Sequence, residues 1–216
     1  FSMTLDWAMR SVLLIGVPAA VALFLLAEPI LATLFQYGAL TPEDVRMAAL
    51  SLRAYGLGLV AFMLVKVLAP GYYARQDTAT PVKIGIIAMV ANMVLNLVLV
   101  VPLMIYWNVG HLGLALATSI AAYLNAGLLL RGLLRAEVYR LQPGWGHYAM
   151  RLLLATGFMA AAVSVLTPDI AVWLDWGWQR RAGEMALVCS GGVGVYLAVH
   201  LLLGTRFRHL RAPSAI

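Results

Sequence analysis

Long apolar stretches without charged residues dominate this chain of 216 residues. A helix needs about 17–25 residues to cross the hydrocarbon core of a bilayer. Five uncharged stretches are of about this length: Ser11–Ala27, Ile84–Tyr106, Val109–Leu130, Leu152–Pro168 and Met185–Thr205. A sixth apolar stretch, between Val45 and Ala74, is interrupted by Arg53 and Lys66. The stretches do not alternate with a period of two, and lone strands cannot satisfy their backbone in lipid, so each predicts a helix. The pattern predicts an all-α integral membrane protein with six transmembrane helices.

The composition supports the membrane class and excludes a soluble domain. Hydrophobic residues make up 63% of the chain and charged residues only 11%, whereas soluble domains are about half apolar and about a quarter charged. The single cysteine, Cys189, excludes an internal disulfide framework and a metal cluster built from cysteines.

The basic residues predict the orientation of the six spans, because cytoplasmic loops are enriched in lysine and arginine. One side carries ten of them: Arg10, Arg75, Lys83, Arg131, Arg135, Arg140, Arg151, Arg206, Arg208 and Arg211. The other side carries three: Arg46, Arg180 and Arg181. We therefore expect a multi-pass membrane protein with both ends of this chain in the cytoplasm. The net charge of +6 is explained by topology and requires no nucleic-acid partner.

One polar stretch, "GYYARQDTATPVKI" (residues 71–84), interrupts the apolar pattern on the predicted cytoplasmic side. Asp77 and Thr78 have the short polar side chains that turns and helix caps require. Pro81 is suited to the first turn of the next helix, where its missing N–H is not needed. The stretch therefore predicts a cytoplasmic turn between two spans.

Two charged residues, Arg53 and Lys66, lie well inside a predicted span. A charge at that depth is costly and marks a functional site by default, although a long side chain can also extend to the membrane interface. A separation of thirteen positions, at 100° per residue, places the two side chains about 140° apart on the helix. Either is a candidate for contacting an anionic substrate, and Arg53 is favoured for attracting anions from the side opposite the cytoplasm.

Polar amides inside a span form a second candidate site. Asn92 and Asn96 lie four residues apart, hence on one helix face, and Thr118 is on the next span. One interpretation is a hydrogen bond between helices, which is common in membrane bundles. The other is a cation site built from carbonyl and hydroxyl oxygens.

Two further patterns concern packing and the membrane interface. The spacing of Gly113, Ala117 and Ala121 predicts close helix packing. The residues Trp173, Trp176 and Trp178 predict a belt at the periplasmic interface.

Several sequence blocks resemble the MurJ/MviN family of bacterial lipid II flippases, within the multidrug/oligosaccharidyl-lipid/polysaccharide exporter superfamily. The polar stretch follows the family pattern at Tyr72, Tyr73, Ala74, Arg75, Gln76, Asp77, Thr78, Thr80, Pro81, Val82 and Lys83. The blocks "LFQYGALTPED" (34–44), "GHLGLALATSIAAYLNAGLL" (110–129) and "QPGW" (142–145) also match, except that Leu40 replaces the family's phenylalanine. The motif loop of Tyr73, Arg75, Asp77, Thr80 and Pro81 is therefore a candidate functional segment.

The resemblance implies that this chain is the C-terminal part of a fourteen-helix transporter with two lobes. Residues 1–135 would supply four spans of the C-terminal lobe, 136–150 a cytoplasmic linker, and 151–216 the last two spans, which form a groove for the lipid tail, and a basic tail. The implied activity is alternating-access flipping of lipid II from the cytoplasmic to the periplasmic face of the bacterial inner membrane. Because Lys66 belongs to the run that leads into the family motif, it is favoured for contacting the pyrophosphate of this substrate. The implied partners are lipid II, membrane lipids and the missing N-terminal lobe, which carries the family's essential arginines. The start at Phe1 also predicts a piece of a longer protein.

Other functions remain open at this point. A relative in the same superfamily could export another polyprenyl-linked saccharide or a drug. A membrane enzyme of lipid-carrier metabolism would need clustered acids or a nucleophile paired with a base, and the acids here are scattered over two loops. We therefore expect no enzyme activity and no cofactor. Coupling to Na⁺, to H⁺ or to the membrane potential is left open by the sequence, because the predicted cation site contains no acid.

Overall fold

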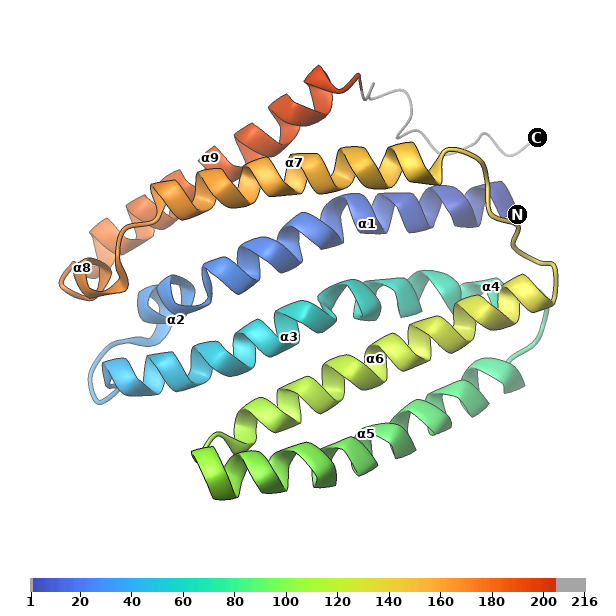
Figure 1. Ribbon diagram of the computed structural model, residues 1–216, viewed down its shortest axis with the longest axis horizontal. Helices are drawn as coiled ribbons and strands as arrows, with labels where there is room; N and C mark the ends of the chain where they lie inside the picture. Colours follow the sequence, from blue (N-terminus) through green and yellow to red (C-terminus); the bar gives the residue numbers. More distant parts are fainter. Residues whose placement is uncertain (1, 205–216) are drawn as a thin grey trace.

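A computed structural model describes residues 2–204, and in this part of the chain the secondary structure is entirely helical (Figure 1). Six helices are long and apolar enough to span a membrane, which confirms the prediction of six spans. They are α1 (Ser2–Leu25), α3 (Pro42–Leu68) continued by the single turn α4 (Pro70–Tyr73), α5 (Ala79–Trp107), α6 (Gly110–Arg135), α7 (Trp145–Leu166) and α9 (Trp178–Leu202). The short helices α2 (Ala27–Phe35) and α8 (Ile170–Leu174) connect spans at one end of the bundle.

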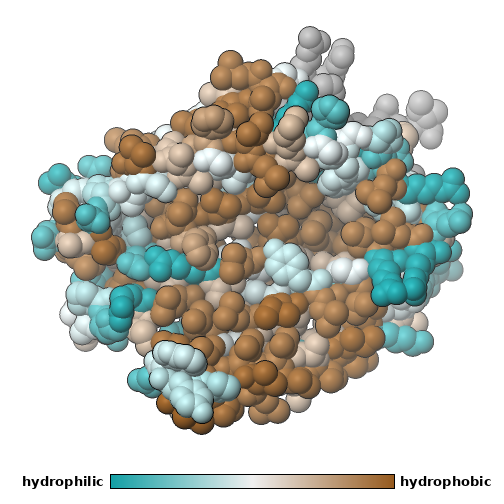
Figure 2. All heavy atoms as spheres, viewed as in Figure 1, coloured by the Kyte–Doolittle hydropathy of each residue, from teal (hydrophilic) through white to brown (hydrophobic). Residues whose placement is uncertain are grey.

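The spatial order of the spans differs from their order in the chain. The most extensive contacts join α5 to α6, α6 to α3, α3 to α1 and α9 to α7, and α7 returns to pack on α1 (Figure 1). Hydrophobic side chains cover the middle of the helices, and hydrophilic side chains gather toward the two ends of the bundle (Figure 2). This distribution is the one expected of a multi-pass membrane protein with its helices along the bilayer normal.

The polar segments at helix starts set several boundaries. Thr41 and Asp44 form a reciprocal capping box at the start of α3, with Pro42 in the first helical position. The Asp77 carboxylate accepts a hydrogen bond from the Thr80 backbone N–H at 3.0 Å, and hydrogen bonding from Thr80 lowers the pKa of this acid. The expected cap at Thr78 is wrong, because its side chain makes no capping bond.

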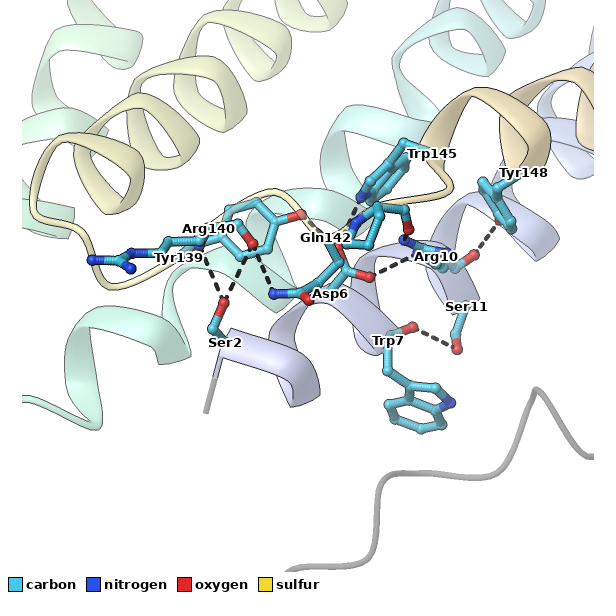
Figure 3. A network of polar contacts seen from close by, with 11 residues as sticks. Ser2, Asp6, Trp7, Arg10, Ser11, Tyr139, Arg140, Gln142, Trp145 and Tyr148 are labelled. Atoms are coloured by element: carbon cyan, nitrogen blue, oxygen red, sulfur yellow. Dashed lines mark hydrogen bonds and ion pairs between the residues drawn. The ribbon is translucent and has the colours of Figure 1, made fainter.

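Two helices begin earlier than the uncharged stretches that predicted them. α1 begins at Ser2, before the stretch that starts at Ser11, and α7 begins at Trp145, before the stretch that starts at Leu152. Residues 136–144 form the connection between α6 and α7, and the division of the chain with a cytoplasmic linker at 136–150 stays a prediction. The reason for the earlier starts is a network between α1 and the linker, in which the polar residues of the first turns find partners (Figure 3). These residues therefore continue the helices instead of forming loops.

The center of this network is Asp6, a buried acid on α1. Its Oδ1 accepts hydrogen bonds from the Tyr139 hydroxyl at 2.7 Å and the Trp145 indole N–H at 2.8 Å. Its Oδ2 lies 2.7 Å from Nε of Arg10, and Nη2 of Arg10 donates to the Pro143 carbonyl at 3.2 Å. Burial, together with the bond to Asp6, raises the pKa of Tyr139, which keeps this hydroxyl a neutral donor. The Asp6 network thus ties α1 to the linker and to the start of α7.

Close approach of the helices depends on small residues at a few positions. Ala117 is fully buried, and a Cβ on Gly113 would meet the α5 backbone at Val100 at 2.9 Å. The Ser119 hydroxyl donates to the Ala54 carbonyl at 2.7 Å across the α6–α3 contact, beside Gly58. The predicted close packing along this face of α6 is confirmed.

Tyr72 from the motif stretch is anchored to α6. The ring is buried, and its hydroxyl donates to the Leu129 carbonyl at 2.7 Å. The space for this hydroxyl exists because residue 132 is a glycine, since a Cβ there would overlap the Tyr72 oxygen. The contact fixes the end of α3–α4 against α6.

The prediction of an interfacial tryptophan belt is wrong for Trp173. This side chain has 0% exposure, and its indole N–H donates to the Thr33 hydroxyl at 3.0 Å. Arg181, which the sequence places among the loop cations, is also buried and donates to three carbonyls, of Ala32, Trp173 and Leu174. The two side chains join α2, α8 and α9 into a packed end of the bundle.

Gly132→Ala should destabilise the full-length protein by about 1–3 kcal/mol, because the added methyl group overlaps the Tyr72 hydroxyl in a packed interface. Gly127→Ala is the matched control, since a Cβ at Gly127 meets nothing within 4 Å. Thermal unfolding of the purified proteins in detergent measures the stability of both variants. Tyr72→Phe in the Gly132→Ala background should restore part of the loss; equal stability of the two alanine variants would contradict the packing argument.

Asp6→Asn should destabilise the protein by about 1–3 kcal/mol, because charge-assisted hydrogen bonds to a buried group are replaced by neutral ones. It should also speed proteolysis within residues 136–144. The control is Glu137→Gln, which removes an exposed ion pair with Arg140 in the same linker and should change stability by about 0.5 kcal/mol or less. Unchanged proteolysis in Asp6→Asn would show that the network does not hold the linker.

Candidate functional site: a polar groove between α3, α5 and α6

An open groove of about 490 Å³ between α3, α5 and α6 is lined by polar groups that lie within the spans. Four polar residues line it: Lys66 from α3, Asn92 from α5, and Thr118 and Asn125 from α6. The remaining walls are apolar or small: Phe62, Val65, Gly85, Ala88, Met89, Ala121 and Ala122. The groove therefore brings together candidate residues from two different predicted sites.

Lys66 contributes the charge of this groove. Its side chain is exposed to the groove, and the four ion pairs of residues 2–204 involve Arg10, Arg46, Arg53 and Arg140 instead. It sits within the long α3–α4 span, with apolar residues on either side along the chain. An ammonium group in this position can attract an anion in surroundings of lower dielectric than water.

Asn92, Asn96 and Thr118 lie together, as the sequence predicts. The Asn92 amide nitrogen donates to the Thr118 hydroxyl at 3.4 Å, and the Asn96 amide nitrogen donates to the Asn92 carbonyl oxygen at 3.1 Å. Thr118 in turn donates to the Leu114 carbonyl at 2.9 Å. These contacts are those of a hydrogen-bonded link between α5 and α6.

One side-chain oxygen of the same cluster is free to accept a further hydrogen bond or to bind a cation. The Asn96 side-chain oxygen is buried and has no hydrogen-bond partner within the described residues. An unpaired buried acceptor is costly, and oxygen ligands suit a hard cation such as Na⁺. The cluster would offer the side-chain oxygens of Asn92, Asn96 and Thr118, without a formal negative charge. A cation site at these residues stays a prediction.

Arg53 lies outside this groove, on the side of α3 that faces α1 and α2. Its Nη2 is 2.9 Å from an oxygen of Glu28, and its Nε donates to the Phe24 carbonyl at 3.3 Å. The separation of Arg53 from Lys66 agrees with their spacing on one helix. Arg46, seven residues earlier on the same helix, is likewise paired, with Glu43 at 2.9 Å, so acids compensate both arginines.

The motif loop lies beside the groove and joins two of its walls. Tyr73 and Arg75 are exposed, whereas Pro81 is buried in the first turns of α5. Gln76 adopts a left-handed backbone conformation with φ 61°, which ends the α4 turn. Together with the Asp77 cap, this geometry directs the chain from α3–α4 into α5. The structure therefore supports a positioning role for the loop.

Two residues important to this region were missed by sequence reasoning. Asn125 lines the groove beside Lys66, and its position seven residues after Thr118 on the same helix face was the available signal. Glu28 neutralises Arg53, and it could have been suggested only by its place at the end of the first span.

Comparison with known proteins agrees with these features. A family described as "Lipid II flippase MurJ" matches residues 1–174. A probable lipid II flippase MurJ of Vibrio cholerae is 47% identical over 214 residues, covering 99% of this chain and 40% of the relative. A probable lipid II flippase MurJ of Haemophilus influenzae is 45% identical over 210 residues, covering 97% and 40%.

Solved structures give the same result for the fold. A lipid II flippase MurJ in an inward closed conformation aligns with a TM-score of 0.71 and 24% identity, over 92% of this chain and 38% of that chain. The chain thus spans about two fifths of the length of the relatives it matches. The family match over residues 1–174, with the similarity to these relatives, shows that the chain belongs to the lipid II flippase MurJ family.

Proposed function

We propose that the full-length protein flips lipid II, the polyprenyl-diphosphate-linked peptidoglycan precursor, from the cytoplasmic to the periplasmic face of the bacterial inner membrane. Membership of the flippase family and the six membrane-spanning helices support this assignment. The observation that carries it within this chain is the groove with Lys66 and three neutral polar residues at membrane depth. Placing polar and charged groups inside the membrane costs free energy, so their presence there indicates a functional role.

In this proposal Lys66 contacts the anionic part of the substrate while the cavity is open to the cytoplasm. The lysine supplies attraction to a diphosphate, and the neighbouring amides of Asn92 and Asn125 can form hydrogen bonds to phosphate or sugar oxygens. The apolar walls lower the local dielectric and so strengthen the attraction. Further cationic contacts would come from the N-terminal lobe, which the family resemblance implies as a partner.

The last two spans, α7 and α9, are proposed to contact the lipid tail of the substrate. In the structure α7 and α9 pack on each other and α7 packs on α1, around a core that includes Leu152, Met159 and Val188. Their outer surfaces expose large apolar side chains such as Phe158 and Leu197. These surfaces fit the proposed groove for the lipid tail. The basic tail that the sequence predicts after Gly204 lies outside the described residues.

Energy coupling is part of the proposal. A cation bound at Asn92, Asn96 and Thr118 would link the α5–α6 contact to transport, because it would compete with the hydrogen bonds that join these residues. Protons or the membrane potential are the alternatives. Each of these stays a prediction.

Lys66→Leu should abolish or strongly reduce flipping in the full-length protein, since the charge is lost while an apolar side chain is tolerated in lipid. Lys66→Arg should retain part of the activity, because the charge survives with altered geometry. The measurement is growth of cells depleted of their own lipid II flippase, with protein level checked by immunoblot. Arg140→Leu, which removes an exposed cation of the linker outside the groove, should support growth. Healthy growth with Lys66→Leu at a normal protein level would remove Lys66 from the site.

The proposed direction of transport requires the motif loop to be cytoplasmic. In a full-length variant with Cys189→Ala, a cysteine at the exposed position Thr78 should resist a membrane-impermeant thiol reagent in intact cells. A cysteine at the exposed position Ala39, at the other end of α3, should react. Labelling in permeabilised cells shows that both thiols are reactive. The reverse pattern would overturn the orientation.

A further inference from the structure

A second groove, of about 250 Å³, lies where the last turns of α6 meet the first turns of α5. It shares no lining residue with the Lys66 groove. Three apolar side chains and two arginines line it, with a glycine between the arginines: Ile84, Ile87, Leu128, Arg131, Gly132 and Arg135. We call this feature the arginine groove.

The two arginines carry positive charge that no ion pair within residues 2–204 compensates. Arg131 and Arg135 are exposed and lie one helical turn apart, hence on one face of α6. Neither belongs to the ion pairs found within residues 2–204. The nearest acid in sequence, Glu137, is paired with Arg140 at 3.0 Å. The favourable effect of a cation on a helix C-terminus accounts for an arginine at the end of α6, but not for an apolar groove beside it.

Polarity changes along the arginine groove in the direction expected of a bound lipid. Arg135 is the last residue of α6, and Leu128 lies seven residues, or about 10 Å, deeper along the helix. On the facing helix, α5 begins at Ala79, and Ile84 and Ile87 follow at increasing depth. Positive charge thus stands at the end of the bundle and apolar surface toward the middle, as a phospholipid headgroup and acyl chain are arranged in one leaflet.

We propose that the arginine groove binds an anionic glycerophospholipid from the leaflet at this end of the bundle. Arg131 and Arg135 hold the phosphate, because guanidinium groups match phosphate geometry and basic pockets between spans bind acidic headgroups. Ile84, Ile87 and Leu128 contact the first part of one acyl chain. The bound lipid would bridge α5 and α6 at the end where the motif loop enters α5.

The test is native mass spectrometry of the full-length protein in detergent, titrated with phosphatidylglycerol or phosphatidylcholine. The wild type should bind phosphatidylglycerol in preference to phosphatidylcholine. Arg131→Gln together with Arg135→Gln should weaken phosphatidylglycerol binding about tenfold or more, since each basic residue near the headgroup contributes substantially. Leu128→Trp, which fills the apolar part without changing charge, should also weaken it. The matched control, Arg140→Gln together with Arg151→Gln, removes two charges from the same end and should change binding by about twofold or less.

Equal losses in the two double variants would overturn the proposal, because the whole basic surface would then attract the lipid. Unchanged binding in Leu128→Trp, with glycerol phosphate competing as well as the lipid, would reduce the groove to a phosphate site. Displacement of phosphatidylglycerol by an equimolar amount of polyprenyl diphosphate would assign it to the transported lipid. Circular dichroism confirms folding of each variant, and the assay needs no transport, so its outcome is independent of the proposed function.

Discussion

Polar groups inside a bilayer must find their partners within the protein, because the hydrocarbon core supplies no water to replace them. This constraint organises the bundle at both ends and in its interior. Asp6 is satisfied by Arg10, Tyr139 and Trp145. Arg53 is paired with Glu28. In each case the partner belongs to a different turn or helix, so satisfying the charge also fixes how the segments pack.

Small residues make these partnerships possible, since a hydrogen bond between helices requires their backbones to approach closely. The Ser119 hydroxyl reaches a carbonyl of α3 beside Gly58, and the Tyr72 hydroxyl reaches a carbonyl of α6 beside Gly132. A larger side chain at either glycine would move the donor away from its acceptor. The close packing of α6 against α3 and the hydrogen bonding of their polar groups therefore depend on the same glycines.

The sequence predicted the features that depend on local pattern. Six spans follow from the length of apolar stretches, and the separation of Arg53 from Lys66 follows from the helical period. Features set by tertiary contacts were harder to predict. Trp173 lies near two acids in a loop and suggested an interface, but folding buries it against Thr33. Asp6 and the linker are more than 130 residues apart, so the local sequence did not indicate the contacts that hold the first turns of α1.

Lys66 differs from Asp6 and Arg53, because none of the ion pairs found within residues 2–204 includes it although it lies well inside a span. The walls of its groove are held at one end by the Tyr72 contact and by the Asp77 cap, which fix α3–α4 and α5 relative to each other. Deeper in the membrane, α5 is joined to α6 by Asn92 and Thr118. In the proposed function, the partner of this charge comes from outside the three helices, either from the rest of the full-length protein or from the anionic substrate. Alternating access would provide such a partner in one state and remove it in the other, which is how one lysine could distinguish the two states.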